Sequence, residues 1–137
     1  MPHVNGVVET ALYVENVARS IEFYQKVFGW PVMDSNERFC ALNVCDRHVL
    51  LLFKTGGTRE AISVPGGVIP PHDGSGQLHA AFAISAPELA EWETWLTEKG
   101  VEIESRVTWP RAGRSLYFRD PDGNLLELAT PGVWPNY

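Results

Sequence analysis

Alternating and helical patterns of apolar positions recur twice along the chain. Glu9–Val14 alternates in the manner of a half-buried strand, and the next stretch, at about Val17–Phe28, carries apolar residues at helical spacing. His79–Ile84 and a stretch at about Pro87–Lys99 repeat this order. The pattern therefore predicts a strand followed by an amphipathic helix in two places.

The residues that end the two helical stretches follow the same order. Gly29 and Gly100 stand directly after them, and glycine best adopts the left-handed conformation that closes a helix. Each helix is expected to lay one apolar face on a sheet. These faces consist of Ile21, Tyr24 and Phe28 in the first helix and of Leu89, Trp92 and Leu96 in the second.

Further strands are predicted after each helix, joined by a tight turn. The turns, Cys45–Arg47 and Pro121–Gly123, contain the aspartate or glycine that hairpin turns require. The sequence thus predicts one unit of a strand, a helix and about three strands, used twice in tandem, which is an α+β fold. The strands concerned are Phe39–Val44 and Val49–Phe53 in the first copy, and Ser115–Arg119 and Leu125–Ala129 in the second.

Glycine and proline concentrate between the two copies, for example at Pro65–Gly67 and Asp73–Gly76. This stretch is expected to be a linker, and loops of this length tend to be functional or mobile. A chain of 137 residues suffices for one compact domain or for two small halves that share an interface. We expect a single domain over residues 1–137, with a first module at about 5–54, a linker at about 55–77 and a second module at about 78–131.

The composition limits where the protein works and what it binds. With 45% hydrophobic and 20% charged residues it is that of an ordinary globular protein, and no apolar run is long enough to cross a membrane. The first residues lack the pattern of a secretory signal, and Cys40 and Cys45 form no CxxC pair, so we expect a cytoplasmic protein without a disulfide framework. A net charge of -6 argues against nucleic acid. The expected partner is a small molecule or another copy of the chain.

Superposing the two copies places potential metal ligands at equivalent positions. Glu9 stands opposite His79, and Leu51 stands opposite Glu127. Each of the three ionisable residues shares its strand face with alanines, because successive side chains alternate across a strand. If the faces curve toward each other, the alanines leave room for a cavity in which two carboxylates and one imidazole converge on a cation.

Each of these residues has an ordinary explanation when it is taken singly. A glutamate in an edge strand usually faces water, and a single histidine usually makes a local hydrogen bond. Their coincidence at equivalent positions favours the metal site. Glu127 is the strongest of them, because it interrupts the apolar strand Leu125–Ala129, where a charge is costly without a partner.

The sequence resembles the vicinal oxygen chelate superfamily, the group of glyoxalases, bleomycin-resistance proteins and extradiol dioxygenases. The resemblance covers about Val7 to Thr130, and Arg119–Leu128 is its most specific part. The segments that carry it are Glu9–Val14, Ser20–Tyr24, Phe28–Gly29, His79–Ile84 and Phe118–Leu128.

The resemblance implies a fold and a ligand set. The expected fold is two tandem βαβββ modules forming an open, mostly antiparallel, cup-shaped sheet, with metal ligands on the first and last strands of each module. These positions correspond to Glu9, Leu51, His79 and Glu127. His79 and Glu127 fit the family pattern. Glu9 stands where the family more often has histidine or glutamine, and Leu51 cannot bind a metal. The resemblance also implies a homodimer.

A site of Glu9, His79 and Glu127 predicts a divalent metal ion as the cofactor. Two carboxylates neutralise a dication, and three protein ligands leave positions for water or for a substrate with two adjacent oxygens. Oxygen-rich ligation suits Fe, Mn, Ni, Zn or Mg. By analogy with the family, Glu127 is also the candidate catalytic general base.

Three functions stay open at this point. The first is a metal-dependent lyase or isomerase of glyoxalase type, and the second is a ring-cleaving dioxygenase. The third is a binding protein without catalysis, like the bleomycin-resistance proteins. Convergent ionisable groups speak against the third function, whereas Leu51 keeps it open.

Other residues are weaker candidates for substrate binding. Arg111 and Arg114 suit an anionic substrate group, since guanidinium pairs well with carboxylates, but a solvated loop is the more ordinary explanation. Trp109 and Trp134 lie in irregular segments at which they can line a site or simply pack. His72 in the linker is a candidate lid residue or extra ligand, with a solvated surface position as the alternative.

Overall fold

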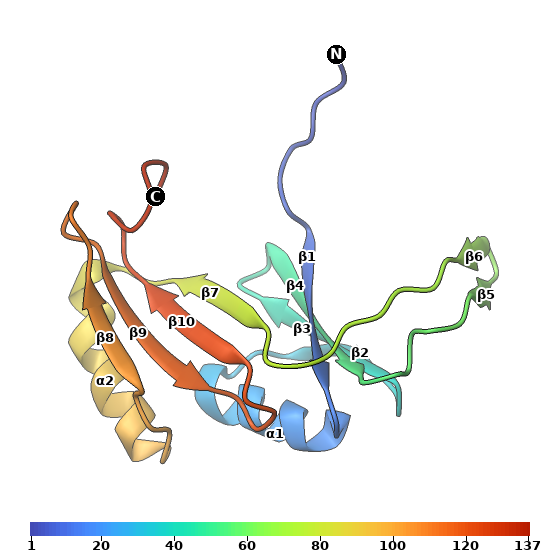
Figure 1. Cartoon of the computed structure of the whole chain (residues 1–137), viewed down its shortest axis with the longest axis horizontal. Coiled ribbons are helices and arrows are strands. Elements are labelled where there is room, and N and C mark those ends of the chain that lie inside the picture. The colour runs from blue at the N-terminus through green and yellow to red at the C-terminus, as the bar shows by residue number, and fades with distance from the viewer. The chain divides into compact units, whose positions relative to one another are not determined.

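The computed structural model describes residues 1–137, and these form two compact units, Met1–Gly76 and Gln77–Tyr137. Each unit contains one α-helix and one four-stranded sheet (Figure 1). Neither helix is long and apolar enough to cross a membrane. The two units are described in turn.

Unit 1 (Met1–Gly76) has its sheet in the order β1-β4-β3-β2. Strand β1 pairs with β4 in parallel, and the remaining pairs of the sheet are antiparallel. A separate hairpin, β5–β6, lies within the segment that was expected to be a plain linker. The elements are β1 (Glu9–Val14), α1 (Val17–Phe28), β2 (Val32–Ser35), β3 (Phe39–Val44), β4 (His48–Lys54), β5 (Ile62–Val64) and β6 (Gly67–Ile69).

Helix α1 has a defined beginning and end. The Asn16 side chain accepts a hydrogen bond from the backbone N–H of Arg19 at 3.0 Å, and Gly29 closes the helix in the left-handed region at φ 69°. The buried stripe is centred on Tyr24, as predicted. Val17, Ser20 and Val27 complete it, whereas the predicted Ile21 and Phe28 are half-buried at its margins.

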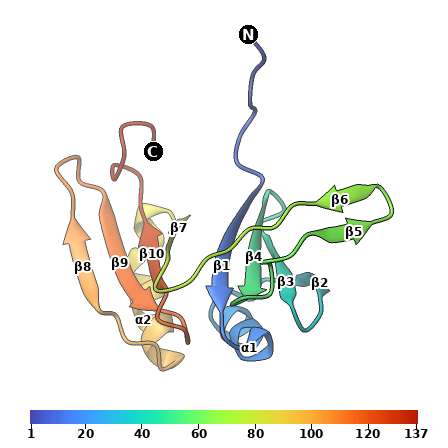
Figure 2. The ribbon, with the colours of Figure 1, turned by 45° about the vertical axis from the view of Figure 1, so that its right-hand side comes forward.

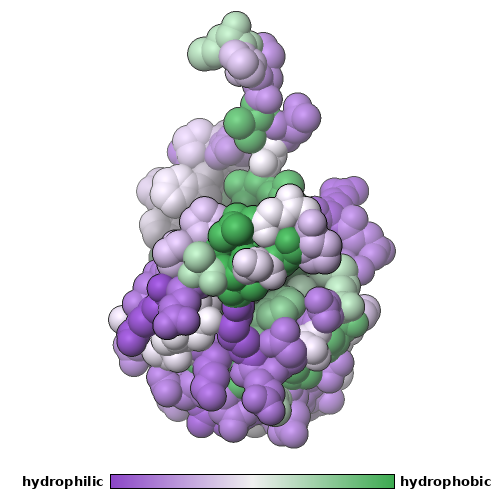
Figure 3. All heavy atoms as spheres, turned by 90° about the vertical axis from the view of Figure 1, so that its right-hand side faces the viewer, coloured by the Kyte–Doolittle hydropathy of each residue, from purple (hydrophilic) through white to green (hydrophobic).

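Hairpin β5–β6 projects away from the four-stranded sheet of unit 1 (Figure 2). The turn between its strands is Pro65–Gly66, and Gly67, the first residue of β6, takes a φ of 152° that favours glycine. Apolar residues of the hairpin remain on the surface, with Val64, Val68 and Ile69 42%, 64% and 46% exposed. Figure 3 is viewed from the side on which this hairpin lies and shows apolar residues gathered there.

Unit 2 (Gln77–Tyr137) repeats the arrangement, with sheet order β7-β10-β9-β8. The second helix begins later than predicted, because residues 86–88 form a separate 3-10 turn. At its start the backbone N–H and the hydroxyl of Ser85 both donate to the Glu88 carboxylate. The elements are β7 (His79–Ala83), η1 (Ala86–Glu88), α2 (Leu89–Glu98), β8 (Ser105–Thr108), β9 (Arg114–Arg119) and β10 (Leu125–Ala129).

Strand register confirms the internal repeat. In unit 1 Ala11 pairs with Leu51 across β1 and β4, and in unit 2 Ala81 pairs with Glu127 across β7 and β10. Leu51 and Glu127 therefore occupy the same position in their modules. The predicted fold class is confirmed: the protein is α+β, with two βαβββ modules whose open sheets are mostly antiparallel.

The two faces of each sheet differ in burial. One face is fully buried and packs with the helix of its own unit, so it forms the core. The other face carries the alternate residues of the same strands, among them Glu9 and Leu51 in unit 1 and His79 and Glu127 in unit 2. The core residues with at most 1% exposure include Leu12, Val14, Leu50 and Leu52 in unit 1 and Leu116, Phe118, Leu126 and Leu128 in unit 2.

Candidate metal site

The turn between β9 and β10 fixes the strands that carry the candidate site. The Asp120 carboxylate accepts hydrogen bonds from the backbone N–H groups of Asp122 and Asn124, both at 2.9 Å, and from the Asn124 side-chain amide at 2.9 Å. The Asn124 side-chain oxygen in turn accepts from the backbone N–H of Leu78, one residue before β7, at 2.9 Å. This turn therefore ties β7 to β10 at the point where His79 enters the sheet.

His79 and Glu127 lie side by side on the open face of unit 2. His79 Nε2 is 3.4 Å from Glu127 Oε2. His79 Nδ1 is 2.9 Å from the backbone carbonyl oxygen of Leu125, which pairs with His79 in the sheet. A carbonyl oxygen only accepts, so Nδ1 carries the proton of this bond. In the neutral ring Nε2 then presents a lone pair toward the carboxylate.

Glu127 is buried, with 6% of its surface exposed, whereas the side chain of His79 is 49% exposed. A buried carboxylate needs compensating partners. The Ser115 hydroxyl donates a short hydrogen bond to Glu127 Oε1. Tyr117 pairs with Glu127 across β9 and β10 and lies on the same face of the sheet. Burial, and secondarily the negative charge of Glu127, raises the pKa of the Tyr117 phenol.

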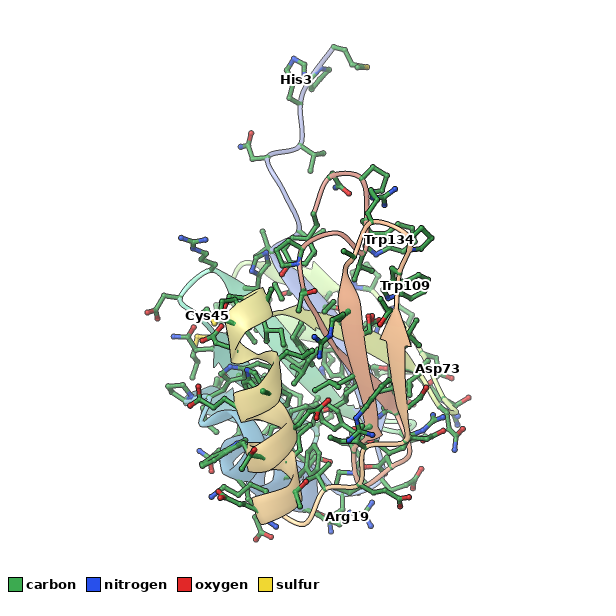
Figure 4. The ribbon with its side chains drawn as sticks, turned by 90° about the vertical axis from the view of Figure 1, so that its left-hand side faces the viewer. His3, Arg19, Cys45, Asp73, Trp109 and Trp134 are labelled. Carbon is green, nitrogen blue, oxygen red and sulfur yellow. The ribbon has the colours of Figure 1, made fainter.

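Trp109 contacts the site through Ser115. Its indole N–H donates to Ser115 Oγ at 2.8 Å, so Trp109 is linked to Glu127 through Ser115. The candidate substrate residue Trp109 is half-buried, and the structure uses its polar atom in an internal hydrogen bond. Figure 4 shows Trp109 near Trp134 at one end of the β8–β9 hairpin.

The turn after Trp109 is held by the C-terminal segment. Gly113 lies so close to this segment that an added Cβ would be 2.2 Å from the backbone nitrogen of Val133, and no side chain larger than hydrogen fits there. Arg111 donates from Nη2 to the carbonyl oxygen of Val133 at 3.3 Å, and Arg114 donates from its backbone N–H to Thr130 Oγ1 at 2.8 Å. Both arginines are exposed. Their substrate-binding role stays a prediction.

Glu9 and Leu51 lie in unit 1. Glu9 is exposed at the start of β1 and pairs with Val49, in the same register as His79 pairs with Leu125 in unit 2. Leu51 is half-buried. Neither unit by itself holds a group of three His, Cys, Asp or Glu side chains arranged to hold a metal ion. The role of Glu9 as a third ligand stays a prediction.

The linker of unit 1 is closed by a second polar cluster. Tyr13 Oη is 2.6 Å from His72 Nδ1 and 3.1 Å from Thr58 Oγ1, and the Thr58 hydroxyl donates to the His72 carbonyl oxygen at 2.6 Å. The His72 ring packs edge-on against Phe53, with 4.8 Å between ring centroids. His72 lies on the surface, as one of the two sequence-based interpretations held. Its contacts with Tyr13 and Thr58 also fasten the linker to β1.

The chain was compared with known proteins. The family description Glyoxalase/Bleomycin resistance protein/Dioxygenase superfamily matches residues 4–128. The chain belongs to this superfamily. The metallothiol transferase FosB of Staphylococcus haemolyticus is 30% identical to it over 128 residues, covering 93% of this chain and 84% of the relative. FosB of Shouchella clausii is 30% identical over 129 residues, covering 93% and 81%.

A solved structure has the same fold over nearly all of both chains. The lactoylglutathione lyase of Agrobacterium tumefaciens superposes with a TM-score of 0.86 at 30% identity, covering 96% of this chain and 98% of the other. The superfamily membership predicted from the sequence is therefore confirmed, and so is the α+β fold of paired modules.

Ser115 and Tyr117 were missed as site residues by the sequence reasoning. The strand Ser115–Arg119 was predicted, and its alternation puts Ser115 and Tyr117 on one face. What the sequence lacks is the antiparallel register, which pairs Tyr117 with Glu127 and Ser115 with Ala129. Polar residues on the same face of two paired strands are the signal that could have identified them.

Proposed function

We propose that the protein is a divalent-metal-dependent enzyme that acts on a small molecule, with lyase or isomerase chemistry of the glyoxalase type. The proposal rests on membership of the superfamily and on the arrangement of His79 and Glu127. The metal site, the substrate and the active homodimer belong to the proposal.

One observation carries the proposal: His79 Nε2 and Glu127 Oε2 face each other at 3.4 Å while His79 Nδ1 is engaged by Leu125. The distance exceeds that of a good N–H···O hydrogen bond, about 2.7–3.2 Å. Two acceptors that face each other need a cation between them, which is either a proton on Nε2 or a metal ion, and the proposal takes the metal ion. A histidine whose other nitrogen donates to a backbone carbonyl is the usual form of a metal-binding histidine.

The donor set also fits a metal in size and chemistry. Donors about 2.0–2.2 Å from one ion, at tetrahedral or octahedral angles, lie about 3.0–3.5 Å apart, and the 3.4 Å separation of Nε2 and Oε2 falls in this range. One imidazole and carboxylate oxygens suit Mn, Fe, Ni or Zn, with Mg favoured less because it prefers oxygen alone. We propose Glu9 as the third ligand.

Leu51 leaves this site with three protein ligands. A three-ligand site keeps positions for a substrate, and a bound divalent ion would act there as a Lewis acid that stabilises an enolate or enediolate. His79 would hold its Nε2 in place through the bond from Nδ1 to Leu125. The half-exposed ring of His79, beside buried Glu127, supports an approach of substrate from the His79 side.

Glu127 is the proposed catalytic base. The substrate C–H would belong to a carbon that carries a hydroxyl and stands next to a carbonyl. Glu127 Oε2, loosened from the metal, would accept this proton, and the electron pair of the bond would form an enediolate. Glu127 would then return the proton to the former carbonyl carbon, while the hydroxyl proton would pass to the former carbonyl oxygen. This sequence is an isomerisation with no net gain or loss of protons or electrons. Such proton transfer by a positioned side chain typically contributes about 10²–10⁴-fold in rate.

A second candidate is metal-dependent transfer of a thiol to an electrophilic small molecule. The relative FosB favours it, since that protein is a metallothiol transferase. Both functions use the same three ligands. They differ in whether Glu127 removes a carbon-bound proton.

Metal content and substrate assays test the proposal together. Wild type should hold one divalent ion per chain, and Glu9→Ala, His79→Ala and Glu127→Ala should lose it.

The loaded enzyme is then assayed with glutathione hemithioacetals, with thiols plus an epoxide, and for oxygen uptake with catechols. Turnover of hemithioacetals is the expected result, conjugation would move the assignment to thiol transfer, and oxygen uptake would move it to a dioxygenase. Wild type that takes up no metal after reconstitution would overturn the proposal in favour of a binding protein.

A further inference from the structure

A chain of hydrogen bonds runs from the β8–β9 turn to the candidate ligand Glu127. The indole N–H of Trp109 donates to Ser115 Oγ at 2.8 Å, and Ser115 Oγ lies within a short hydrogen bond of Glu127 Oε1. Both Ser115 and Glu127 are buried, with 1% and 6% of their surfaces exposed. Solvent therefore competes little for these bonds.

The direction of the chain follows from the protons available. An indole N–H only donates, so Ser115 Oγ accepts from Trp109. A serine hydroxyl has one proton, and the acceptor within reach is Glu127 Oε1. Ser115 thus donates to the carboxylate while Trp109 keeps the hydroxyl turned toward it.

This chain makes the two oxygens of Glu127 unequal. Oε1 is held by Ser115, whereas Oε2 faces His79 Nε2 at 3.4 Å. The last torsion of a glutamate side chain is broad and roughly two-fold, so without such a bond the carboxylate could rotate. With it, one oxygen is fixed toward the histidine.

The internal repeat gives an independent observation. Strand register makes Leu51 the counterpart of Glu127 and Phe39 the counterpart of Ser115. The first module, which lacks the carboxylate, also lacks the hydroxyl that would hold it.

We propose that Ser115, held by Trp109, is a positioning residue that orients Glu127 so that Oε2 faces the metal and the substrate. The inference rests on the proposed metal-dependent function. Under this inference Trp109 acts on Glu127 through Ser115, rather than by contacting the substrate as the sequence analysis considered. Outer partners of metal ligands typically contribute about 10–100-fold in metal affinity or activity.

The test measures Mn²⁺ binding by titration calorimetry on the full chain. Ser115→Ala should weaken Mn²⁺ affinity about 10–100-fold, Ser115→Thr should restore most of the loss because it keeps the hydroxyl, and Trp109→Phe should weaken binding by a smaller factor. Ser105→Ala, an exposed serine on the neighbouring strand, and Trp95→Phe, an exposed tryptophan on α2, are matched controls that should bind Mn²⁺ as wild type does. Thermal unfolding of each variant separates misfolding from loss of the bond.

A second readout needs neither metal nor activity. In the metal-free protein the NMR resonance of the Trp109 indole N–H, assigned by its absence in Trp109→Phe, should shift in Ser115→Ala and in Glu127→Gln. In the loaded enzyme Ser115→Ala should lower kcat more than it changes KM.

The outcomes separate the two proposals. Wild-type Mn²⁺ affinity in a folded Ser115→Ala variant, or a Ser115→Thr variant as weak as Ser115→Ala, overturns the positioning role, while loss of metal in Glu127→Ala leaves the proposed function standing. Retention of full Mn²⁺ affinity in Glu127→Ala overturns both.

Discussion

The two modules of the chain share one scaffold and differ in the chemistry of their open sheet faces. Each pairs its first strand with its last in parallel and in the same register. In unit 2 the face holds Glu127, Tyr117 and Ser115, and the Ser115 hydroxyl donates a hydrogen bond to Glu127. In unit 1 the same three positions are apolar, namely Leu51, Ala41 and Phe39.

This comparison shows that a buried carboxylate and its partners change as a set. Unit 2 surrounds Glu127 with two hydroxyl groups and an imidazole, which offset the cost of burying its charge. Unit 1 has neither the charge nor the hydroxyls. The strands pair in the same register whether the open face is polar or apolar, because register depends on the main-chain hydrogen bonds and on the side chains of the core face.

The polar clusters of the two units also differ in what they hold. In unit 1 the Tyr13, His72 and Thr58 cluster joins β1 to the base of the linker. In unit 2 the Trp109, Ser115 and Glu127 chain ends at a carboxylate that faces a histidine. We therefore expect the first cluster to contribute stability and the second to contribute chemistry.

The largest expected effect comes from neutralising Glu127, whose counterpart in unit 1 is the uncharged Leu51. Glu127→Gln should lower kcat for the best hemithioacetal substrate by about 10²–10⁴-fold, because the base is lost while the shape is kept. Glu98→Gln, an exposed glutamate at the end of α2, is the control and should retain turnover. Full turnover by Glu127→Gln would exclude a role for Glu127 as the base.

A carboxylate placed in unit 1 tests whether its partners are needed. Leu51→Glu should lower the free energy of unfolding by about 1–3 kcal/mol, because the residues that pair with Leu51, Ala11 and Ala41, offer the half-buried charge no side-chain donor. Adding Phe39→Ser supplies a hydroxyl where Ser115 stands in unit 2. A double-mutant cycle from urea unfolding should give a favourable coupling of about 0.5–3 kcal/mol between the two changes. Strict additivity would show that the two positions do not interact.

Removing the hydroxyl of Tyr13 tests the structural role of the cluster in unit 1. Tyr13→Phe should lower the free energy of unfolding by about 1–2 kcal/mol, because it removes two partly buried hydrogen bonds. Metal content measured by mass spectrometry should stay at the wild-type value. A metal-free Tyr13→Phe protein would show that the two clusters do not divide their roles as described.

The smallest expected effect concerns Cys40, whose counterpart in unit 2 is Leu116. Burial, and secondarily the charge of Asp34, raises the pKa of the Cys40 thiol from 9.0 to about 11. The unfolded chain therefore loses this proton at lower pH than the folded one, so stability is retained below pH 9.0 and falls as the pH rises toward about 11. Urea unfolding across this range should show the decline in wild type and a weaker one in Cys40→Ala. An equal decline in both would assign it to other groups.

Much of the fold could be predicted because it depends on local pattern. The bounds of β1, α1, β3 and β10 agree with the sequence-based ranges, since alternation, helical spacing and Gly29 mark them. The start of α2 was predicted two residues early, because Pro87 suits the first turn of an α-helix and in the structure lies in a 3-10 turn instead. Hairpin β5–β6 was missed, because its strands are three residues long and lie among glycines and prolines.

The candidate site was predicted less completely, for a physical reason. His79 and Glu127 stood out because each is ionisable on a strand with small or apolar neighbours, and the structure brings them together. Ser115 and Trp109 are ordinary residues in the sequence. Their relation to Glu127 depends on the register between β9 and β10 and on the turn after β8, which act across the sheet rather than along the chain.

The central claim is that His79 and Glu127 bind one divalent ion, and anomalous diffraction from crystals grown with Mn²⁺ tests it most directly. The account predicts one strong anomalous peak per chain, about 2.0–2.3 Å from both His79 Nε2 and Glu127 Oε2, which disappears in crystals of His79→Ala. A well-occupied peak elsewhere, with no density between these two atoms, would contradict it.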